Sequence, residues 1–216
     1  MATLPFSTKR TIEAYTTHQK LFLRQWNQRN YTVPPHLQLW LEHIPIGSRL
    51  LDLGCGPGQD SRFLRRMGYR VVGIDLTWPY LKTARGRSPR LPLIYGDIRT
   101  LPFYPQVFDG IWAAASLIHV PKRNTTVLLR QLLALTKPAG WLAMTVMHGK
   151  ESGIPDAQWI PGRFLAKWHK PELADMVRRA GWRNVKIRRV YNQERKGSWL
   201  NLVAQRPPSR HSPTYM

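Results

Sequence analysis

Acidic residues and cysteine are scarce in this chain, and long apolar runs are absent. Only 12 Asp and Glu accompany 33 Lys and Arg among 216 residues. The single cysteine excludes an internal disulfide and is typical of a reducing compartment. No apolar run approaches the roughly 20 residues that cross a bilayer, and the first residues lack the apolar core of a secretory signal. We therefore expect a cytoplasmic protein with no membrane partner.

The formal net charge of +21 makes polyanions a partner class to consider. Nucleic acid fits this charge, as does an anionic substrate or surface. However, the basic residues are spread along the chain without a block of five or six, and a generally basic proteome gives the same composition. The 7 histidines are scattered and no His/Cys spacing matches a zinc site, so we expect no bound metal.

Short apolar runs alternate with helix-like segments along most of the chain. The runs that we expect to be strands are residues 48–53, 69–75, 92–97, 108–120 (including the exit of the strand) and 141–149. The segments that we expect to be helices are residues 36–44, 58–68, 77–85, 124–137 and 171–181, with Pro138 ending the fourth of them. Residues 184–192 and 198–206 are expected to form a hairpin, and residues 149–170 a long loop.

This alternation predicts an α/β fold, namely a doubly wound, Rossmann-like, seven-stranded sheet with helices on both faces. The sheet is expected to be mostly parallel, with an antiparallel strand added by the C-terminal hairpin. In such sheets, ligands bind beyond the carboxyl ends of the strands. Asp52, Asp75, Asp97 and residues 116–119 lie at or near those ends, so we expect the binding site there.

A glycine-rich loop follows the first expected strand in the sequence LLDLGCGPGQD (residues 50–60). Its glycines stand at positions 54, 56 and 58, where the lack of a Cβ lets a ligand pack directly on the backbone. The spacing is GxGxG, which differs from the GxGxxG dinucleotide fingerprint. No Lys-Ser/Thr pair follows the loop, which disfavours a nucleoside triphosphate.

Two acids end the next two expected strands and suit an adenosine. Asp75 can accept both hydroxyls of a ribose, as it would in a NAD site, or it can cap a helix or turn. Asp97 can accept the exocyclic amine of an adenine with Ile98 packed on the base, or it can form an Asx-turn. Together with the glycine loop and Asp52, these residues predict a pocket for an adenosine that carries a short amino-acid arm.

Five stretches between residues 48 and 148 carry a combined pattern: LLDLGCGPGQDSRFL, VVGIDLT, LIYGDIRTLPF, FDGIWAAASLIHVPK and LLALTKPAGWLAMTV. In this order they resemble successive motifs of the class I S-adenosylmethionine-dependent methyltransferases, and the chain is similar to small stand-alone bacterial members. The resemblance implies S-adenosyl-L-methionine (SAM) as the cofactor. We expect an N-terminal helical cap (residues 1–33), a SAM-binding methyltransferase domain (34–206) and, from its composition, a flexible tail (207–216).

The resemblance assigns cofactor contacts residue by residue. Those around the methionine arm and the ribose are Asp52, Gly54, Cys55, Gly56 and Gly58. Asp75 and Leu76 are assigned to the ribose hydroxyls, and Asp97 and Ile98 to the adenine. Ala115 and Ser116 would line the site after the fourth strand. One departure is Ala139, which replaces the first of two glycines usual in a structural turn of the family.

The residues expected to meet the methyl acceptor lie outside these motifs. His119 follows the fourth strand and is the candidate general base, with a histidine bonded within its own loop as the alternative. Tyr15 of the first helix, and Glu151 and Arg163 of the long loop, are the expected substrate contacts. Further candidates on the same two segments are Trp26, Lys150, Trp159 and Trp168.

These features favour an enzyme that methylates a small molecule by in-line displacement. The net charge keeps an RNA methyltransferase as an alternative, although the Asn-Pro-Pro-Tyr type of tetrapeptide used for base amines is absent after the fourth strand. A protein that binds SAM without catalysis is a third possibility. Neither the acceptor nor the oligomeric state is marked in the sequence.

Overall fold

The computed structural model describes residues 4–27, 34–155, 160–192 and 197–209. The strands in this part are β1 (Arg49–Leu53), β2 (Arg70–Asp75), β3 (Leu93–Tyr95), β4 (Phe108–Ala114), β5 (Thr136–His148), β6 (Lys167–Trp168), β7 (Arg183–Asn192) and β8 (Gly197–Gln205). The helices are α1 (Phe6–Thr17), α2 (Gln19–Asn27), α3 (Pro35–Leu41), α4 (Gln59–Arg66), α5 (Trp78–Arg87), the short 3-10 helix η1 (Leu117–His119), α6 (Lys122–Leu135) and α7 (Lys170–Arg179).

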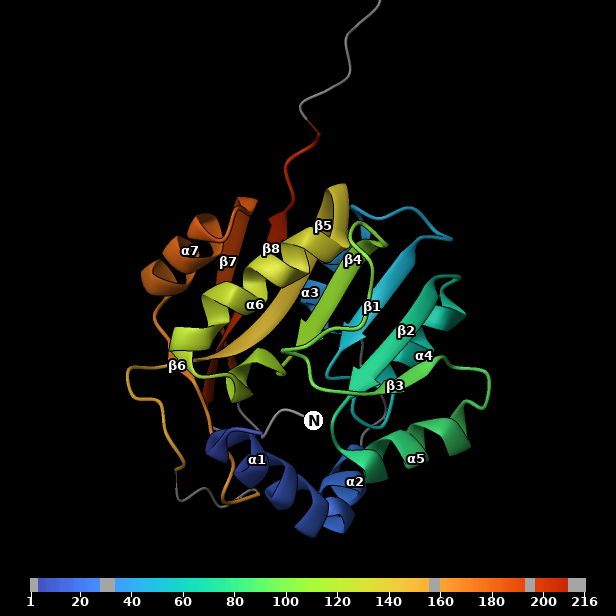
Figure 1. Cartoon of the computed structure of the whole chain (residues 1–216), viewed down its shortest axis with the longest axis vertical. Helices are drawn as coiled ribbons and strands as arrows, with labels where there is room; N and C mark the ends of the chain where they lie inside the picture. The colour runs from blue at the N-terminus through green and yellow to red at the C-terminus, as the bar shows by residue number, and fades with distance from the viewer. Residues whose placement is uncertain (1–3, 28–33, 156–159, 193–196, 210–216) are drawn as a thin grey trace, which may run out of the picture.

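The strands form one sheet in the order β3-β2-β1-β4-β5-β8-β7, with β6 pairing on β5 outside this path (Figure 1). β8 is antiparallel to both of its neighbours, β5 and β7. The remaining pairings are parallel. The expected doubly wound, mostly parallel sheet with an antiparallel C-terminal hairpin is therefore confirmed. The two-residue β6 is an addition within the segment that was expected to be a loop.

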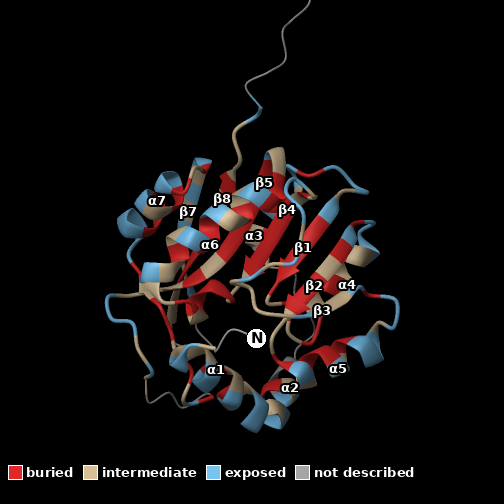
Figure 2. Cartoon of the chain, in the orientation of Figure 1, coloured by how far each residue is buried: buried red, intermediate tan, exposed pale blue. Residues whose placement is uncertain are grey.

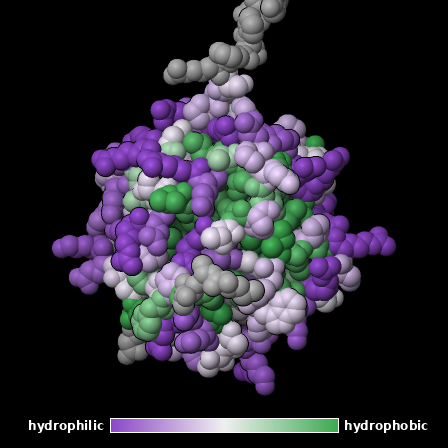
Figure 3. All heavy atoms as spheres, in the orientation of Figure 1, coloured by the Kyte–Doolittle hydropathy of each residue, from purple (hydrophilic) through white to green (hydrophobic). Residues whose placement is uncertain are grey.

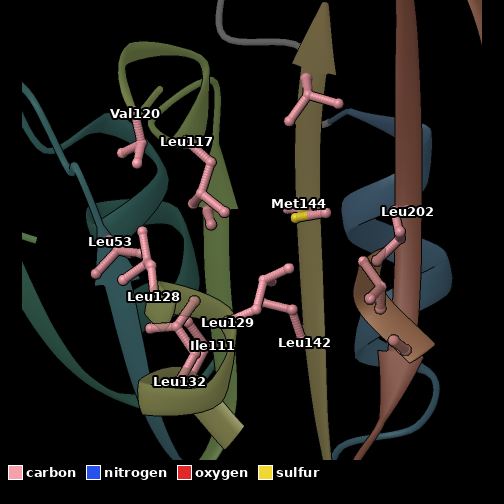
Figure 4. Packing of buried hydrophobic residues seen from close by; sticks show 14 of the residues in the cluster. Leu53, Ile111, Leu117, Val120, Leu128, Leu129, Leu132, Leu142, Met144 and Leu202 are labelled. Atoms are coloured by element: carbon pink, nitrogen blue, oxygen red, sulfur yellow. The ribbon is translucent and has the colours of Figure 1, made fainter. Parts of the chain in front are cut away.

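Helices lie on both faces of the sheet, and the central strands are buried on both sides (Figure 2). Along β4, Ile111 and Ala113 enter the core layer under α6 and α7, whereas Trp112 between them enters the layer under α3 and α4. This burial of both faces explains why the parallel strands read as continuous apolar runs. Figure 4 shows the first layer, in which Leu128, Leu129 and Leu132 of α6 pack against side chains of β1, β4, β5 and β8.

No helix covers the front of β1 and β2 in Figure 1, where the segment 97–107 crosses the sheet instead. Three of its side chains, Ile98, Leu101 and Phe103, pack against the core while staying partly exposed. Figure 3 accordingly shows hydrophobic residues at the surface on this part of the face. The adenine contact expected at Ile98 therefore belongs to a segment that also closes the core.

The expectation that Pro138 ends the helix over residues 124–137 is wrong. α6 ends at Leu135, and Pro138 lies within β5, where the register between β4 and β5 shifts. Proline lacks an N–H but is tolerated at such an irregularity. Ala139 follows with φ +60°, and a Cβ on Gly140 would lie 2.7 Å from the carbonyl oxygen of Asp109. The turn that was expected after the helix is thus a bulge inside the strand.

The N-terminal helices α1 and α2 lie beyond the carboxyl ends of β1, β2 and β4 (Figure 1). The hydroxyl of Tyr80 in α5 donates to the carbonyl of Tyr15 in α1 at 3.3 Å, and Gln19 of α2 donates to the carbonyl of Pro79 at 3.4 Å. These bonds hold the two helices against the sheet edge where the site is expected. Within the described ranges, none of the helices combines the length and the apolar character that crossing a bilayer requires.

Candidate cofactor and acceptor site

The glycine loop between β1 and α4 adopts a backbone that only glycine takes readily. Gly54, Gly56 and Gly58 have φ values of +75°, +51° and +75°. A Cβ on Gly54 would lie 2.5 Å from the Cβ of Ser116, so this glycine lets β1 and the exit of β4 approach each other. By contrast, a Cβ on Gly56 would meet no atom within 4 Å, so the loop is open to a ligand at that point.

Asp75 ends β2 and ties the glycine loop to the start of α5. Its Oδ2 accepts the N–H of Gly56 at 2.8 Å, and its Oδ1 accepts the N–H of Thr77 at 2.7 Å. Burial raises the pKa of this carboxyl, while the two backbone hydrogen bonds oppose the rise. Since each carboxylate oxygen offers two lone pairs, both remain able to accept a ligand hydroxyl. Thr77 occupies the N-cap position of α5 but makes no capping hydrogen bond with its side chain.

Asp52 lies beneath the glycine loop and bonds to α4, and its expected contact with the cofactor stays a prediction. Its side chain is buried, and its Oδ2 accepts the hydroxyl of Ser61 in α4. Burial, with Asp60 nearby, raises the pKa of the Asp52 carboxyl to about 8. Asp60 in turn accepts the indole N–H of Trp112 at 2.7 Å. Asp52 thus also anchors α4 beneath the glycine loop, and the sequence interpretation missed this contact because Ser61 carries no motif of its own.

Asp97 follows β3 and is engaged by Arg99. The Arg99 Nε lies 3.0 and 3.1 Å from the two carboxylate oxygens, Nη2 adds a third contact, and the Arg99 backbone N–H donates at 2.9 Å. This is the turn that the sequence left open as the alternative for Asp97. The contact of Asp97 and Ile98 with an adenine stays a prediction. It requires the carboxylate to share its lone pairs with Arg99.

The exit of β4 brings a strained residue and a buried hydroxyl to the glycine loop. Ala115 has φ +55°, in the left-handed region that side chains disfavour, and its N–H donates to Thr145 of β5 at 3.1 Å. Ser116 is 7% exposed, and among the described residues its Oγ has no hydrogen-bond partner. Cys55 is also buried, and burial raises the pKa of its thiol, which disfavours the thiolate that a nucleophile needs.

Three residues predicted to serve the acceptor meet beside this loop. The hydroxyl of Tyr15 lies 2.9 Å from Nε2 of His119 and accepts Nη1 of Arg163 at 3.1 Å. His119 Nδ1 lies 2.8 Å from the carbonyl oxygen of Phe164. Because a carbonyl only accepts, Nδ1 carries the proton, and Nε2 accepts from Tyr15. Segments far apart in the sequence thus form one hydrogen-bonded chain, which we call the Tyr15 cluster (Tyr15, His119 and Arg163).

The surroundings of the Tyr15 cluster are aromatic. Phe22 and Tyr80 stack at 4.7 Å and both meet the Tyr15 ring edge-on, at 5.6 and 5.7 Å. The Arg163 guanidinium lies 5.3 Å from the centre of the Tyr15 ring. Burial lowers the pKa of His119 to about 4, so this imidazole is neutral near pH 7. The sequence interpretation missed Phe22 and Tyr80, whose helical spacing resembled that of ordinary core residues.

The remaining acceptor candidates are not brought into the cluster. Glu151 and Lys150 are exposed on the loop after β5. Trp168 is fully buried in the core, with the Lys122 ammonium 4.8 Å from its ring centre. Trp159 lies outside the described residues, as does the side chain of Trp26.

Known proteins are similar to this chain over the segment that holds the glycine loop. Residues 50–140 match the family model described as a methyltransferase domain. The chain is 35% identical over 143 residues to the 2-phytyl-1,4-naphtoquinone methyltransferase of Thermosynechococcus vestitus. That match covers 61% of this chain and 59% of the relative, so the chain spans less than two thirds of the relative's length.

Solved structures share the fold at lower identity. The 1,6-didemethyltoxoflavin-N1-methyltransferase of Burkholderia thailandensis, with bound 1,6-didemethyltoxoflavin and S-adenosylhomocysteine, superimposes with a TM-score of 0.75 at 20% identity. The superposition covers 96% of this chain and 93% of that one. The cyclase SpnF superimposes with a TM-score of 0.62 at 22% identity, over 80% of each chain. At these identities the likeness shows the fold alone, and one of the two proteins is named for a different reaction.

Proposed function

Because this chain belongs to the class I S-adenosylmethionine-dependent methyltransferases, we propose that it transfers a methyl group from SAM to a small-molecule acceptor. The cofactor is proposed to lie against the glycine loop and Asp75, with the acceptor between this loop and the Tyr15 cluster. The observation that supports this proposal most directly is the open space beside the backbone of Gly56. This glycine has a left-handed backbone, presents no atom within 4 Å of a Cβ position, and donates its N–H to the acid that ends β2.

The residues at the loop fit an adenosine with an amino-acid arm. Gly56 leaves space where the backbone faces the ligand, and Asp75 keeps acceptor capacity for ribose hydroxyls. Ser116 offers a buried hydroxyl with no partner among the described residues, which suits a polar group of the arm or of the acceptor. The bound sulfonium would supply an activated methyl and a neutral leaving group.

The protein's part in such a displacement is mainly to hold and orient. Placing reacting atoms about 3–3.5 Å apart and in line supplies much of the rate acceleration. α1 and α2 cover the edge of the sheet that holds the glycine loop, so they would exclude water from the acceptor. This is the cap role that we propose for the N-terminal segment.

We further propose that Tyr15 contacts the acceptor and that His119 positions Tyr15. Nε2 of His119 accepts from Tyr15 while Nδ1 is committed to Phe164, so both ring nitrogens are occupied. An imidazole whose pKa is lowered to about 4 is also a weak base. His119 as the general base would require Tyr15 to move first. Deprotonation is needed only if the acceptor atom carries a proton that must leave.

Calorimetry with S-adenosylhomocysteine tests the cofactor assignment. Removing a hydrogen bond to a charged group costs about 1.5–3 kcal/mol, so Asp75→Ala should weaken binding by roughly 10- to 150-fold. Asp75→Asn keeps the size and one carbonyl acceptor and should lose less. Leu93→Val at the neighbouring strand is the matched control and should bind normally. Tight binding of NADH in place of S-adenosylhomocysteine would overturn the proposal.

Turnover on acceptors separates the three functions that the sequence left open. Release of S-adenosylhomocysteine in the presence of small aromatic or anionic acceptors supports the proposed activity. Methylation of RNA alone would favour an RNA methyltransferase, for which the net charge of +21 is the motivation. Cofactor binding without turnover on either class would favour a non-catalytic SAM-binding protein.

A further inference from the structure

The outer face of α5 carries an exposed tryptophan, although most of the tryptophan side chains that the structure describes are buried. Trp40, Trp112, Trp168 and Trp182 are fully buried. Trp78, the first residue of α5, is 53% exposed, and Tyr95 at the end of β3 is 58% exposed. Their rings meet edge to face with centroids 5.6 Å apart. An exposed aromatic pair of this kind offers a flat apolar surface on which a ligand can pack.

Basic residues continue from this pair along the same helical stripe. Lys82 and Arg85 follow Trp78 at positions i+4 and i+7, so the three share the outer face of α5, and both are exposed. The stripe spans roughly 10 Å at the rise of an α-helix. No acidic residue occurs anywhere between residues 76 and 96, whereas the cations Lys82, Arg85, Arg87 and Arg90 do.

The positive charge extends to the neighbouring helix. Gly58 at the start of α4 faces Ala84 of α5, and a Cβ on Gly58 would lie 3.0 Å from the Ala84 Cβ. Burial and the nearby Arg87 and Arg66 lower the pKa of the half-buried Arg62 guanidinium in α4. Positive charge is therefore gathered on α4 and α5, which pack against each other.

Complementing a helix dipole explains only part of this arrangement. Arg85 and Arg87 lie in the last turn of α5, where cations are favoured. Trp78 and Tyr95 lie at the opposite end of the helix, and an exposed aromatic pair gains nothing from the dipole. A ligand that combines flat apolar rings with regularly spaced negative charge fits both halves of the stripe.

We propose that the α5 stripe (Trp78, Lys82, Arg85 and the adjoining Tyr95) binds single-stranded nucleic acid, with a base stacked on the aromatic pair and phosphates on the two cations. Base stacking on exposed aromatics combined with a basic track is the general mode of sequence-tolerant single-strand binding. The stripe lies outside the Tyr15 cluster, and its aromatic end adjoins the cofactor site, because Tyr95 pairs with Asp75 in the sheet. This binding does not depend on the proposed function.

Fluorescence anisotropy with a labelled 20-nucleotide oligouridine tests the proposal as a function of salt. The charge reversal Lys82→Glu/Arg85→Glu should weaken binding at 50 mM salt by at least tenfold. It should also reduce the slope of log K against log salt by about 1.4, at roughly 0.7 for each phosphate that the variant no longer neutralises. The matched control Lys186→Glu/Arg188→Glu changes the same charges on exposed positions of β7 and should lose less than threefold.

The aromatic half of the stripe makes a second, different prediction. Trp78→Ala should weaken binding about 5- to 150-fold, the worth of one stacked base, while leaving the salt slope unchanged. Tyr95→Ala should act in the same direction. Urea denaturation of each variant, compared with the unmodified protein, reports whether the fold is intact.

Three results would overturn the proposal. The first is no oligouridine binding at 50 mM salt. The second is equal loss in the two charge-reversed variants, which would mean that binding follows net charge. The third is normal binding by Trp78→Ala together with equally tight binding of polyglutamate, which would indicate an acidic protein as the partner.

Discussion

Replacing the glycines of the loop one at a time should separate folding from ligand binding. Gly54 and Gly56 share a left-handed backbone, so an alanine at either position costs about 1–2 kcal/mol of strain. Only at Gly54 does the added Cβ meet a neighbour, at 2.5 Å from the Ser116 Cβ. Overpacking of that kind costs about 1–3 kcal/mol more. Gly54→Ala should therefore lose roughly 2–5 kcal/mol of stability, and Gly56→Ala roughly 1–2 kcal/mol.

Ligand binding should show the opposite ranking. The Cβ of Gly56→Ala enters the open space in which the cofactor is proposed to lie. A steric cost of about 1–3 kcal/mol there weakens S-adenosylhomocysteine binding by roughly 5- to 150-fold. Gly56→Val should bind more weakly still.

Urea denaturation without ligand and calorimetry with ligand measure the two effects independently. The double variant Gly54→Ala/Ser116→Gly removes the atom that the new Cβ meets, so it should recover about 1–3 kcal/mol relative to additivity. Equal destabilisation by Gly54→Ala and Gly56→Ala would refute the close approach of β1 and the β4 exit. Undiminished ligand binding by Gly56→Val would refute the proposed position of the cofactor.

Three further predictions concern residues around the site. The pKa of His119 is about 4 in the folded protein and about 6.5 in an unfolded chain, so the unfolded state binds more protons between these two pH values. The free energy of unfolding should therefore fall by up to about 3 kcal/mol as the pH drops from 6.5 toward 4. Urea denaturation of His119→Asn should show a smaller fall over the same pH range. Ser61→Ala leaves the buried Asp52 carboxyl without this donor and should cost about 1–3 kcal/mol in the same assay, with Ser88→Ala at the C-cap of α5 as the control. Ala139→Gly relieves a left-handed backbone at φ +60° and should raise stability by about 0.5–1 kcal/mol, seen as a higher melting temperature; no change would mean that Ala139 carries no strain.

Local backbone chemistry accounts for what was predictable in the fold. The apolar runs ending in Asp52 and Asp75 became β1 and β2, because burial on both faces leaves an unmistakable pattern. Glycines at 54, 56 and 58 became a left-handed loop because few other residues adopt that conformation. Pro138 misled the prediction, since a proline is compatible both with a helix end and with a bulge in a strand. The pairing with β4, which decides between them, is absent from the local sequence.

In the candidate site, too, some features were predictable from local sequence and others depended on the packing of distant segments. The sequence by itself determined which residues stand at the carboxyl ends of the parallel strands, because strand-like and helix-like segments alternate and each apolar run ends at an identifiable residue. Only the tertiary structure decided which hydrogen bond each polar side chain makes. Ser61 donates to Asp52 and Arg99 donates to Asp97. Tyr15 bonds to His119, which lies 104 positions away in the chain. A hydrogen bond depends on angles and distances between segments, and these are set by packing rather than by neighbours in sequence.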